Sequence, residues 1–221
     1  YLLNLVNDVL DMNKLESGNI QLERKHFNLL ELLHNTNEII RMQANEAGVN
    51  YYVEAGEIIH TQLIGSPVHF QQILMNIGSN AVKYNHDGGS VTVTCREISY
   101  TDTTAEYELT CTDTGFSMSE EFQKRAFEPF AQEGQLARTK YAGTGLGLAI
   151  SRKLIELQGG TLFFESIQGK GTKFILHISF EISAEEQKKK FHMYQNCSVE
   201  GIQVLLVEDN ELNMEIAEFL L

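Results

Sequence analysis

The chain has 221 residues, 43% of them apolar, and a formal net charge of −13. Its length permits one good-sized domain with extensions or two small domains. The acidic balance argues against nucleic acid as a partner, and no apolar run is long enough to cross a bilayer. Cys95, Cys111 and Cys197 show no metal-ligand spacing. We therefore expect reduced thiols and a cytoplasmic location.

The first part of the chain predicts a mixture of helices and strands. Apolar residues at helical spacing predict a helix over residues 2–16, with Gly18 as its C-terminal cap. Pro67 after Ser66 is a favourable start for a strong helix over residues 67–84. Between these two helices we expect a strand, a second helix and two short strands, over residues 19–27, 28–46, 50–56 and 61–66.

The middle of the chain predicts hairpins and one more helix. Residues 89–99 and 104–113 are expected to pair as antiparallel strands, and the chain closes with strands over 160–166 and 172–181. A helix over 146–158 stands between the two pairs. This order predicts an α/β fold with a mixed, mostly antiparallel sheet and helices on one face.

The composition of the sequence changes after the last of these strands. Residues 183–200 are charged and without a convincing period, which is typical of a linker. Residues 201–221 begin with a continuous apolar strand that ends at Glu208 and Asp209, followed by an amphipathic helix. One strand and one helix are too small to fold alone. We therefore expect this piece to dock on the preceding domain or to pair with another copy.

Polar residues on the helix at 67–84 form the first part of a candidate site. Asn76, Asn80, Lys83 and Tyr84 share one face, separate from the apolar stripe. Asparagine is a mediocre helix former, and a solvated face would usually carry Glu and Lys instead. An amide oxygen can ligate Mg²⁺ and a lysine can pair with phosphate. The pattern therefore favours a nucleotide site over a plain solvated face.

Two loops add further candidates. Asp113 ends a strand before Gly115, and its carboxylate has the chemistry to accept from the amine of adenine, although an ordinary Asp-x-Gly turn is the alternative. Phe127 and Phe130 are both expected to pack and to anchor a lid over residues 131–142. Few large apolar residues and a central glycine predict low local stability for this lid.

Three glycines at alternate positions, Gly143, Gly145 and Gly147, lead into the helix at 146–158. A residue without Cβ lets the backbone approach an anion closely, and the N-terminal N–H groups of the helix then point at the charge. The spacing is neither that of Walker A nor that of the Rossmann pattern. The alternative is a glycine-rich turn that caps an ordinary helix.

Together, these four features resemble the N, G1, F and G2 boxes of sensor histidine kinases, in that order. The resemblance covers about residues 1–181 and implies the Bergerat ATP-binding fold, a two-layer α/β sandwich. Residues 1–18 resemble the end of the second helix of a dimerisation and phosphoacceptor bundle, which forms a homodimer in such kinases. Residues 19–182 resemble the catalytic domain, and 201–221 the start of a receiver domain. The source thus resembles a hybrid histidine kinase.

The resemblance implies a role for each matching residue. Asn80 would coordinate Mg²⁺ with Asn76 beside it, Lys83 and Tyr84 would meet the phosphates or ribose of ATP, and Asp113 would read adenine. The remaining residues of the implied ATP site are Gly115, Phe127, Phe130, Gly143, Gly145, Leu146, Gly147 and Thr172. Ser117 departs from the pattern, because the family has a glycine there, and we expect it to stiffen the turn and to alter the adenine end of the pocket.

The position of Asn76 separates kinase from ATPase. Related ATPases of this fold place a glutamate there as the base that activates water, and an amide cannot take that proton. Transfer to an imidazole needs positioning and charge stabilisation rather than a base. The expected acceptor histidine precedes Tyr1 and the receiver aspartate follows Leu221, so we expect this piece alone to be inactive. A nucleotide-binding pseudokinase, which Ser117 supports, and a GHKL-type ATPase are the alternatives.

Overall fold

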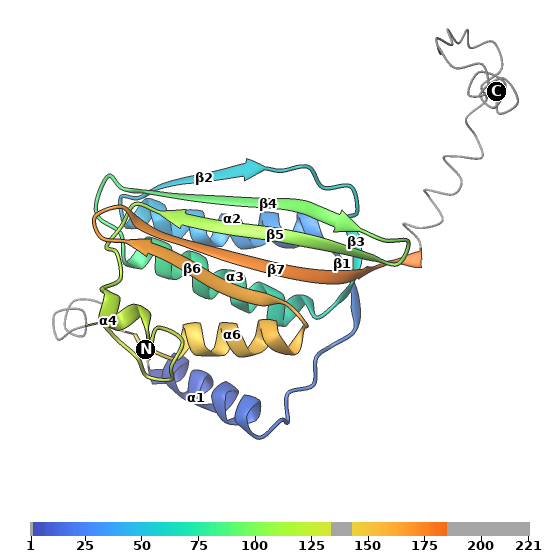
Figure 1. Cartoon of the computed structure of the whole chain (residues 1–221), viewed down its shortest axis with the longest axis horizontal. Coiled ribbons are helices and arrows are strands. Elements are labelled where there is room, and N and C mark those ends of the chain that lie inside the picture. Colours follow the sequence, from blue (N-terminus) through green and yellow to red (C-terminus); the bar gives the residue numbers. More distant parts are fainter. Residues whose placement is uncertain (1, 134–142, 185–221) are drawn as a thin grey trace, which may run out of the picture. The chain divides into compact units, whose positions relative to one another are not determined.

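The computed structural model describes residues 2–133 and 143–184 (Figure 1). Residues 134–142 of the expected lid, most of the expected linker and the whole of residues 201–221 lie outside the described residues. Residues 1–187 form one compact unit, and the description below concerns that unit. No helix in the described ranges is both long and apolar enough to cross a membrane.

The unit combines seven strands with helices that cover one face of the sheet (Figure 1). The helices are α1 (Leu2–Glu16), α2 (Leu29–Glu46), α3 (Pro67–Lys83), α4 (Glu120–Gln123) and α6 (Gly147–Leu157). The strands are β1 (Lys25–Asn28), β2 (Asn50–Ala55), β3 (Gln62–Gly65), β4 (Ser90–Tyr100), β5 (Thr104–Asp113), β6 (Thr161–Ile167) and β7 (Gly171–Ile182). The expected α/β class and mostly antiparallel sheet are confirmed.

The strand order is β1-β3-β7-β5-β4-β2, with β6 also paired to β7. The β4–β5 and β6–β7 hairpins are antiparallel, as expected, and β2 runs parallel to β4. Because β7 is long, its first half pairs with β6 and its end pairs with β3, while β5 lies along its other side. This pairing brings the end of β5 beside the start of β7, where Asp113 and Thr172 lie.

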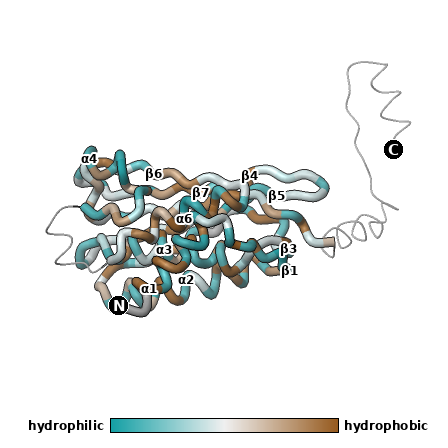
Figure 2. The backbone as a smooth tube through the Cα atoms, turned by 90° about the horizontal axis from the view of Figure 1, so that it is seen from below, coloured by the Kyte–Doolittle hydropathy of each residue, from teal (hydrophilic) through white to brown (hydrophobic). Residues whose placement is uncertain are grey.

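Each long helix packs by an apolar stripe whose alternation with polar residues is visible in Figure 2. On α3 the expected stripe is buried, with Phe70 and Ile73 fully enclosed and Ile77 and Ala81 nearly so. The N-terminus of α2 is capped by the Asn28 side chain, which accepts a hydrogen bond from the backbone N–H of Glu31. The core therefore lies between the helices and one face of the sheet.

Two expectations about local structure are corrected. The predicted strand over residues 19–27 is shorter, because β1 pairs only with the four residues of β3 and the chain before Lys25 has no strand to join. The short helix α4, which the sequence pattern did not predict, begins at Ser119, whose side chain accepts a hydrogen bond from the N–H of Phe122.

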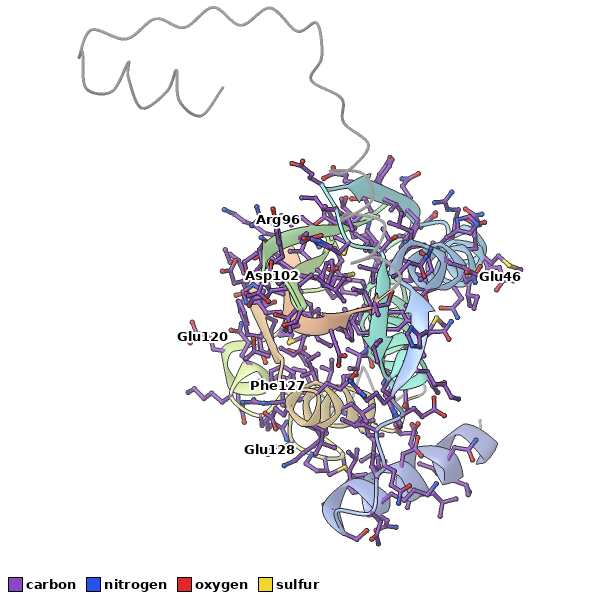
Figure 3. All side chains as sticks on the ribbon, turned by 90° about the vertical axis from the view of Figure 1, so that its right-hand side faces the viewer. Glu46, Arg96, Asp102, Glu120, Phe127 and Glu128 are labelled. Carbon is purple, nitrogen blue, oxygen red and sulfur yellow. The ribbon has the colours of Figure 1, made fainter. Side chains whose placement is uncertain are left out.

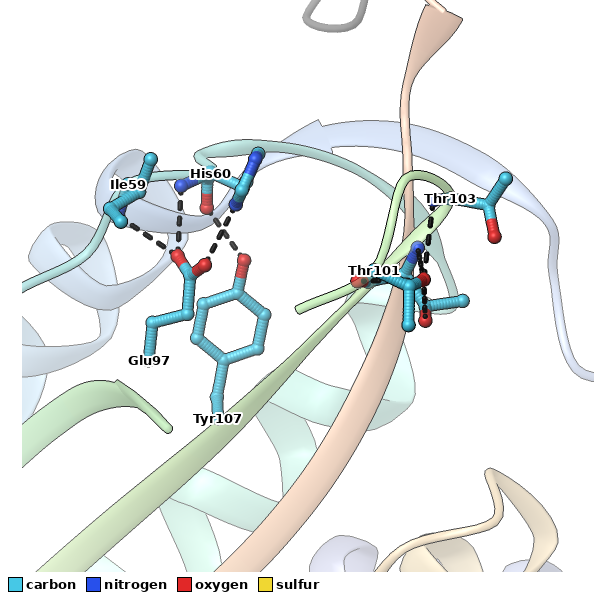
Figure 4. A network of polar contacts seen from close by, with 7 residues as sticks. Ile59, His60, Glu97, Thr101, Thr103 and Tyr107 are labelled. Carbon is cyan, nitrogen blue, oxygen red and sulfur yellow. Dashed lines mark hydrogen bonds and ion pairs between the residues drawn. The ribbon is translucent and has the colours of Figure 1, made fainter. Parts of the chain in front are cut away.

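A buried polar network fixes the loop before β3 to the sheet (Figure 4). Glu97 lies at an irregularity of β4, and one of its carboxylate oxygens lies 2.7 Å from His60 Nδ1. The other oxygen accepts the backbone N–H groups of Ile59 and His60, both at 2.9 Å. The Tyr107 hydroxyl donates to the carbonyl of His60 at 2.6 Å. Since Tyr107 is near the start of β5, this network lies at the opposite end of that strand from Asp113.

Candidate functional site

Asp113, the last residue of β5, is a buried carboxylate with one oxygen held by the backbone. Its side chain is 5% exposed, and Oδ1 accepts the N–H groups of Gly115 at 2.9 Å and of Thr172 at 3.3 Å. Among the described residues, Oδ2 has no hydrogen-bond partner. Burial raises the pKa of Asp113 to about 6, against the opposing effect of the two backbone hydrogen bonds. A carboxylate held in this way can accept a hydrogen bond from a ligand through Oδ2.

Two glycines allow close packing of the backbone around Asp113. A Cβ on Gly115 would lie 2.3 Å from the carbonyl oxygen of Tyr84, so the turn after Asp113 packs directly on the end of α3. A Cβ on Gly171, whose φ is +90°, would lie 1.9 Å from the carbonyl oxygen of Asp113. Only glycine fits either position without moving backbone.

Ser117, the residue that departs from the family pattern, forms three hydrogen bonds with the turn between β6 and β7. Its hydroxyl donates to the carbonyl of Ile167 at 2.8 Å. The same oxygen accepts the N–H groups of Gly169 at 2.8 Å and Gly171 at 3.3 Å. The serine thus ties the loop after Asp113 to the turn that precedes Thr172.

Asn76 connects α3 with α6. Its side-chain nitrogen donates to the carbonyl of Gly147 at 3.3 Å and to the hydroxyl of Ser151 at 3.2 Å. Because its nitrogen is engaged in this way, the amide oxygen is oriented near Gly147, where a Cβ would lie 3.5 Å from it. Asn80 lies one turn further along α3, and its side chain forms no hydrogen bond to the described residues.

Lys83 and Tyr84 end α3 beside the first glycine of the loop. A Cβ on Gly143 would lie 2.7 Å from Lys83 Nζ and 3.7 Å from the Tyr84 hydroxyl. Burial lowers the pKa of Lys83, because the buried ammonium group is less well solvated than it would be in water. The pKa of Tyr84 is raised by burial and by the nearby charge of Glu133, so its hydroxyl remains a donor at neutral pH. The expected face of α3 and the glycine loop therefore meet.

The glycine loop, residues 143–147, connects the region beside Lys83 to the N-terminus of α6. Gly145 has a φ of +72°, and a Cβ there would lie 2.8 Å from the carbonyl carbon of Phe130. Leu146 is fully buried and anchors the start of the helix. The hydroxyl of Thr144 accepts the N–H of Leu146 at 3.2 Å and donates to Asp8 of α1 at 2.7 Å. The N-terminus of α6 thus lies beside Asn76, which contacts Gly147, and follows a loop whose Gly143 lies beside Lys83.

The two phenylalanines behave differently, and the expectation that both pack is wrong for Phe130. Phe127 packs against Phe164, with ring centroids 5.4 Å apart, and the guanidinium of Arg152 lies 4.8 Å from its centroid. Figure 3 shows Phe127 near α6, while Glu128 lies outside. Phe130 has a φ of +63° and is 61% exposed. The close approach of Gly145 to the Phe130 backbone leaves its side chain on the outer side.

A hollow of about 910 Å³ lies elsewhere, between α1, α6 and β6. Phe127 is the one candidate site residue among those that line it. Asp113, the α3 face and the glycine loop do not line this hollow, so it is distinct from the candidate nucleotide site.

Sequence reasoning missed several contacts of the site. Thr144 with Asp8, Gln132 with the carbonyl of Gly143 at 2.8 Å, and Ser166 with the hydroxyl of Thr172 at 2.9 Å all support residues that were predicted. Each contact joins segments that no local pattern relates, except Ser166, which faces Thr172 in the β6–β7 register. For that contact the β6–β7 hairpin pairing is the signal that the sequence carries.

Comparison with known proteins agrees with this geometry. Residues 65–182 match the family described as histidine kinase-, DNA gyrase B-, and HSP90-like ATPase, which is more than half of the chain. The sensor kinase/phosphatase LuxQ of Vibrio cholerae is 32% identical over 99% of this chain, which spans 26% of the relative. The histidine-protein kinase BarA of Escherichia coli is 31% identical over 82% of this chain, which spans 20% of that relative. The chain therefore spans about a quarter or less of these relatives.

Solved structures give the same assignment. Full-length ShkA in complex with AMPPNP superposes with a TM-score of 0.69 at 28% identity, over 84% of this chain and 37% of that one. The nucleotide-free catalytic domain of the histidine kinase ThkA gives a TM-score of 0.59 at 25% identity, over 74% of this chain and 99% of that one. The chain belongs to the family of histidine kinase-, DNA gyrase B- and HSP90-like ATPases, and within that family it is a catalytic domain of the sensor histidine kinase type.

Proposed function

We propose that this chain binds Mg-ATP between α3, α6 and the end of β5, and that it supplies the γ-phosphoryl group to a histidine on a helix bundle. In the complete kinase, which we propose to be a hybrid type, that group would pass on to a receiver aspartate. The observation that carries the proposal is the buried Asp113, whose Oδ1 is held by two backbone N–H groups while Oδ2 has no partner among the described residues. ShkA, which superposes on this chain, was solved with an ATP analogue.

Each candidate residue has a role that its geometry supports. Asp113 Oδ2 accepts from the exocyclic amine of adenine, and Thr172 keeps that carboxylate in place through its N–H. Gly143, Gly145 and Gly147 leave room for phosphate oxygens at the N-terminus of α6. Lys83, next to Gly143, pairs with those oxygens. Burial lowers the pKa of Lys83, and the negative charge of the phosphates acts in the opposite direction by favouring the protonated ammonium.

The amides of α3 fit a divalent cation. The Asn80 side chain forms no hydrogen bond to the described residues. The Asn76 side chain uses its nitrogen in two hydrogen bonds, which leaves its amide oxygen as a potential ligand. Both are neutral oxygen donors, which suit Mg²⁺ that also binds phosphate. When bound, Mg²⁺ neutralises charge that develops on the transferred group. Asn76 meanwhile holds α6 against α3 and so fixes the distance between the two halves of the site.

The ATPase alternative is disfavoured by Asn76. An amide cannot act as the base that removes a proton from water, and the Asn76 nitrogen already donates to Gly147 and Ser151. Against the pseudokinase alternative, which Ser117 suggests, the three hydrogen bonds of this residue join the loop after Asp113 to the turn before Thr172, and this supports an ordered adenine end of the site.

Titration calorimetry with Mg-ADP and Mg-GDP tests the proposal directly. We expect saturable binding of Mg-ADP, and we expect Asp113→Asn to weaken it more than it weakens Mg-GDP, because adenine carries a donor amine at C6, where guanine carries a carbonyl oxygen that cannot donate to the carboxylate. Absence of Mg-ADP binding at millimolar concentration would refute the proposal. Labelled ATP with a separately made acceptor-helix bundle then tests transfer, and a bundle whose acceptor histidine is replaced by glutamine is the matched control.

A further inference from the structure

The turn between β6 and β7 is held in place from outside the hairpin. Residues Ile167, Gly169 and Gly171 all meet one atom, the hydroxyl oxygen of Ser117, which uses its single donor and both of its acceptor positions. A second link lies beside it, because the N–H of Met118 donates to the hydroxyl of Ser166 at 2.9 Å. The loop after Asp113 is therefore fastened to this hairpin at two successive residues.

The position of that turn decides what the Asp113 carboxylate meets. Gly171 packs its Cα against the Asp113 carbonyl, and the next residue, Thr172, donates its N–H to Asp113 Oδ1. The hydroxyl of Thr172 lies 2.9 Å from that of Ser166, so the links from Ser117 and Met118 converge on Thr172. A shift of the turn by a few tenths of an ångström would lengthen the 3.3 Å contact between Thr172 and Asp113 beyond a useful hydrogen bond.

We propose that Ser117 is a positioning residue for adenine nucleotides, because its hydroxyl holds the 167–171 turn and thereby aims Asp113 at the base. This inference rests on the proposed nucleotide site. A glycine at this position has no hydroxyl, so it leaves the carbonyl of Ile167 and the N–H groups of Gly169 and Gly171 to find other partners. In this chain the Ser117 hydroxyl orders the 167–171 turn, which lies at the adenine end of the proposed site.

The proposal has a signature in the pH dependence of binding. A hydrogen bond to the ionised carboxylate lowers its pKa, so a weaker Thr172 contact raises the pKa of Asp113 above its value of about 6. Other ionisable groups lie on the elements packed around Asp113. Burial raises the pKa of Cys111 on β5 to about 12 and also raises the pKa of Tyr84 at the end of α3, so neither group changes charge near pH 6. The His86 ring faces Phe116 of the loop after Asp113, with ring centroids 6.5 Å apart, so the pH midpoint is compared only between variants that all keep His86.

The experiment measures Mg-ADP affinity between pH 5 and 8 for wild type, Ser117→Ala, Ser117→Thr and Ser117→Val. Threonine keeps the hydroxyl, and valine has the same shape without it. We expect Ser117→Ala and Ser117→Val to bind about tenfold more weakly at pH 7, with the pH midpoint for binding moved upward. Ser117→Thr is expected to restore both values relative to Ser117→Val. Ser119→Ala, which removes a hydroxyl two residues away that caps α4, is the control and is expected to leave both values unchanged.

The outcomes separate the role of Ser117 from the proposed nucleotide site on which it rests. Wild-type affinity and an unmoved midpoint in Ser117→Ala would overturn the role of Ser117 while leaving the nucleotide site intact. Equal affinities for the threonine and valine variants would overturn it as well, even if Ser117→Ala folds poorly. Failure of the wild-type protein to bind Mg-ADP would instead contradict the proposed function itself.

Discussion

Replacing Gly171 with alanine tests how closely backbone packs around Asp113. The new Cβ would lie 1.9 Å from the Asp113 carbonyl oxygen, 2.7 Å from its carbonyl carbon and 2.9 Å from the Thr114 Cα. All three are backbone atoms, so no side-chain rotation relieves the overlap. The residue also has a φ of +90°, which costs an alanine about 1–2 kcal/mol, and overpacking adds about 1–3 kcal/mol.

Gly169 in the same turn is the matched control. Its φ is +77°, yet a Cβ there meets nothing within 4 Å, so Gly169→Ala carries the conformational cost alone, about 1–2 kcal/mol. Denaturant unfolding is expected to show a loss of about 2–5 kcal/mol for Gly171→Ala, which corresponds to a fall in Tm of roughly 4–20 °C. Equal losses for the two variants would refute the steric argument, and unchanged Mg-ADP binding in Gly171→Ala would refute the coupling to Asp113.

Four further perturbations separate stability from binding. Burial raises the pKa of Asp113 to about 6, so the free-energy cost of its ionisation in the folded state grows as pH rises from its ordinary pKa of about 4 to about 6 and is constant above that. Asp113→Asn is therefore expected to raise the free energy of unfolding of the nucleotide-free protein at pH 8, by up to about 3 kcal/mol, with little change at pH 4 in denaturant titrations. Wild-type Mg-ADP affinity is expected to fall in calorimetry as pH drops through 6, because the protonated carboxyl no longer accepts from the amine. Lys83→Met is expected to weaken ATP more than adenosine, and equal losses would contradict a phosphate contact. His60→Ala leaves the buried carboxylate of Glu97 without its side-chain partner, so unfolding should cost about 3 kcal/mol less while Mg-ADP affinity stays unchanged. Deleting residues 200–221 is expected to leave Mg-ADP binding intact, because residues 1–187 form one compact unit, and light scattering is expected to show a change in solubility or oligomeric state.

Helices and hairpins were predictable from the sequence because their signals are local. The apolar stripe of α3, its proline start and the alternation of β4 and β5 each lie within one segment and match the structure. The strand over residues 19–27 was overestimated because a strand exists only as far as its partner extends, and β3 offers four residues. No local pattern carries the length of a distant partner.

The candidate site divides in the same way. Asn76, Asn80, Lys83 and Tyr84 share a helix face by simple periodicity, so their common location followed from spacing. The exposure of Phe130 did not, because it depends on where the Gly145 backbone packs. The three hydrogen bonds of Ser117 run from the loop after β5 to the β6–β7 turn, and only the fold brings these two segments together.

The central place of β7 has a consequence for biosynthesis. This strand pairs with β3, β5 and β6, and it is the last strand among the described residues. Until β7 is made, β1 and β3 have no ladder to the group of β2, β4 and β5, and two sheet edges stay unpaired. A nascent chain that stalls before Gly171 would therefore expose aggregation-prone edges, and the sheet closes in one late step when residues 171–182 leave the ribosome.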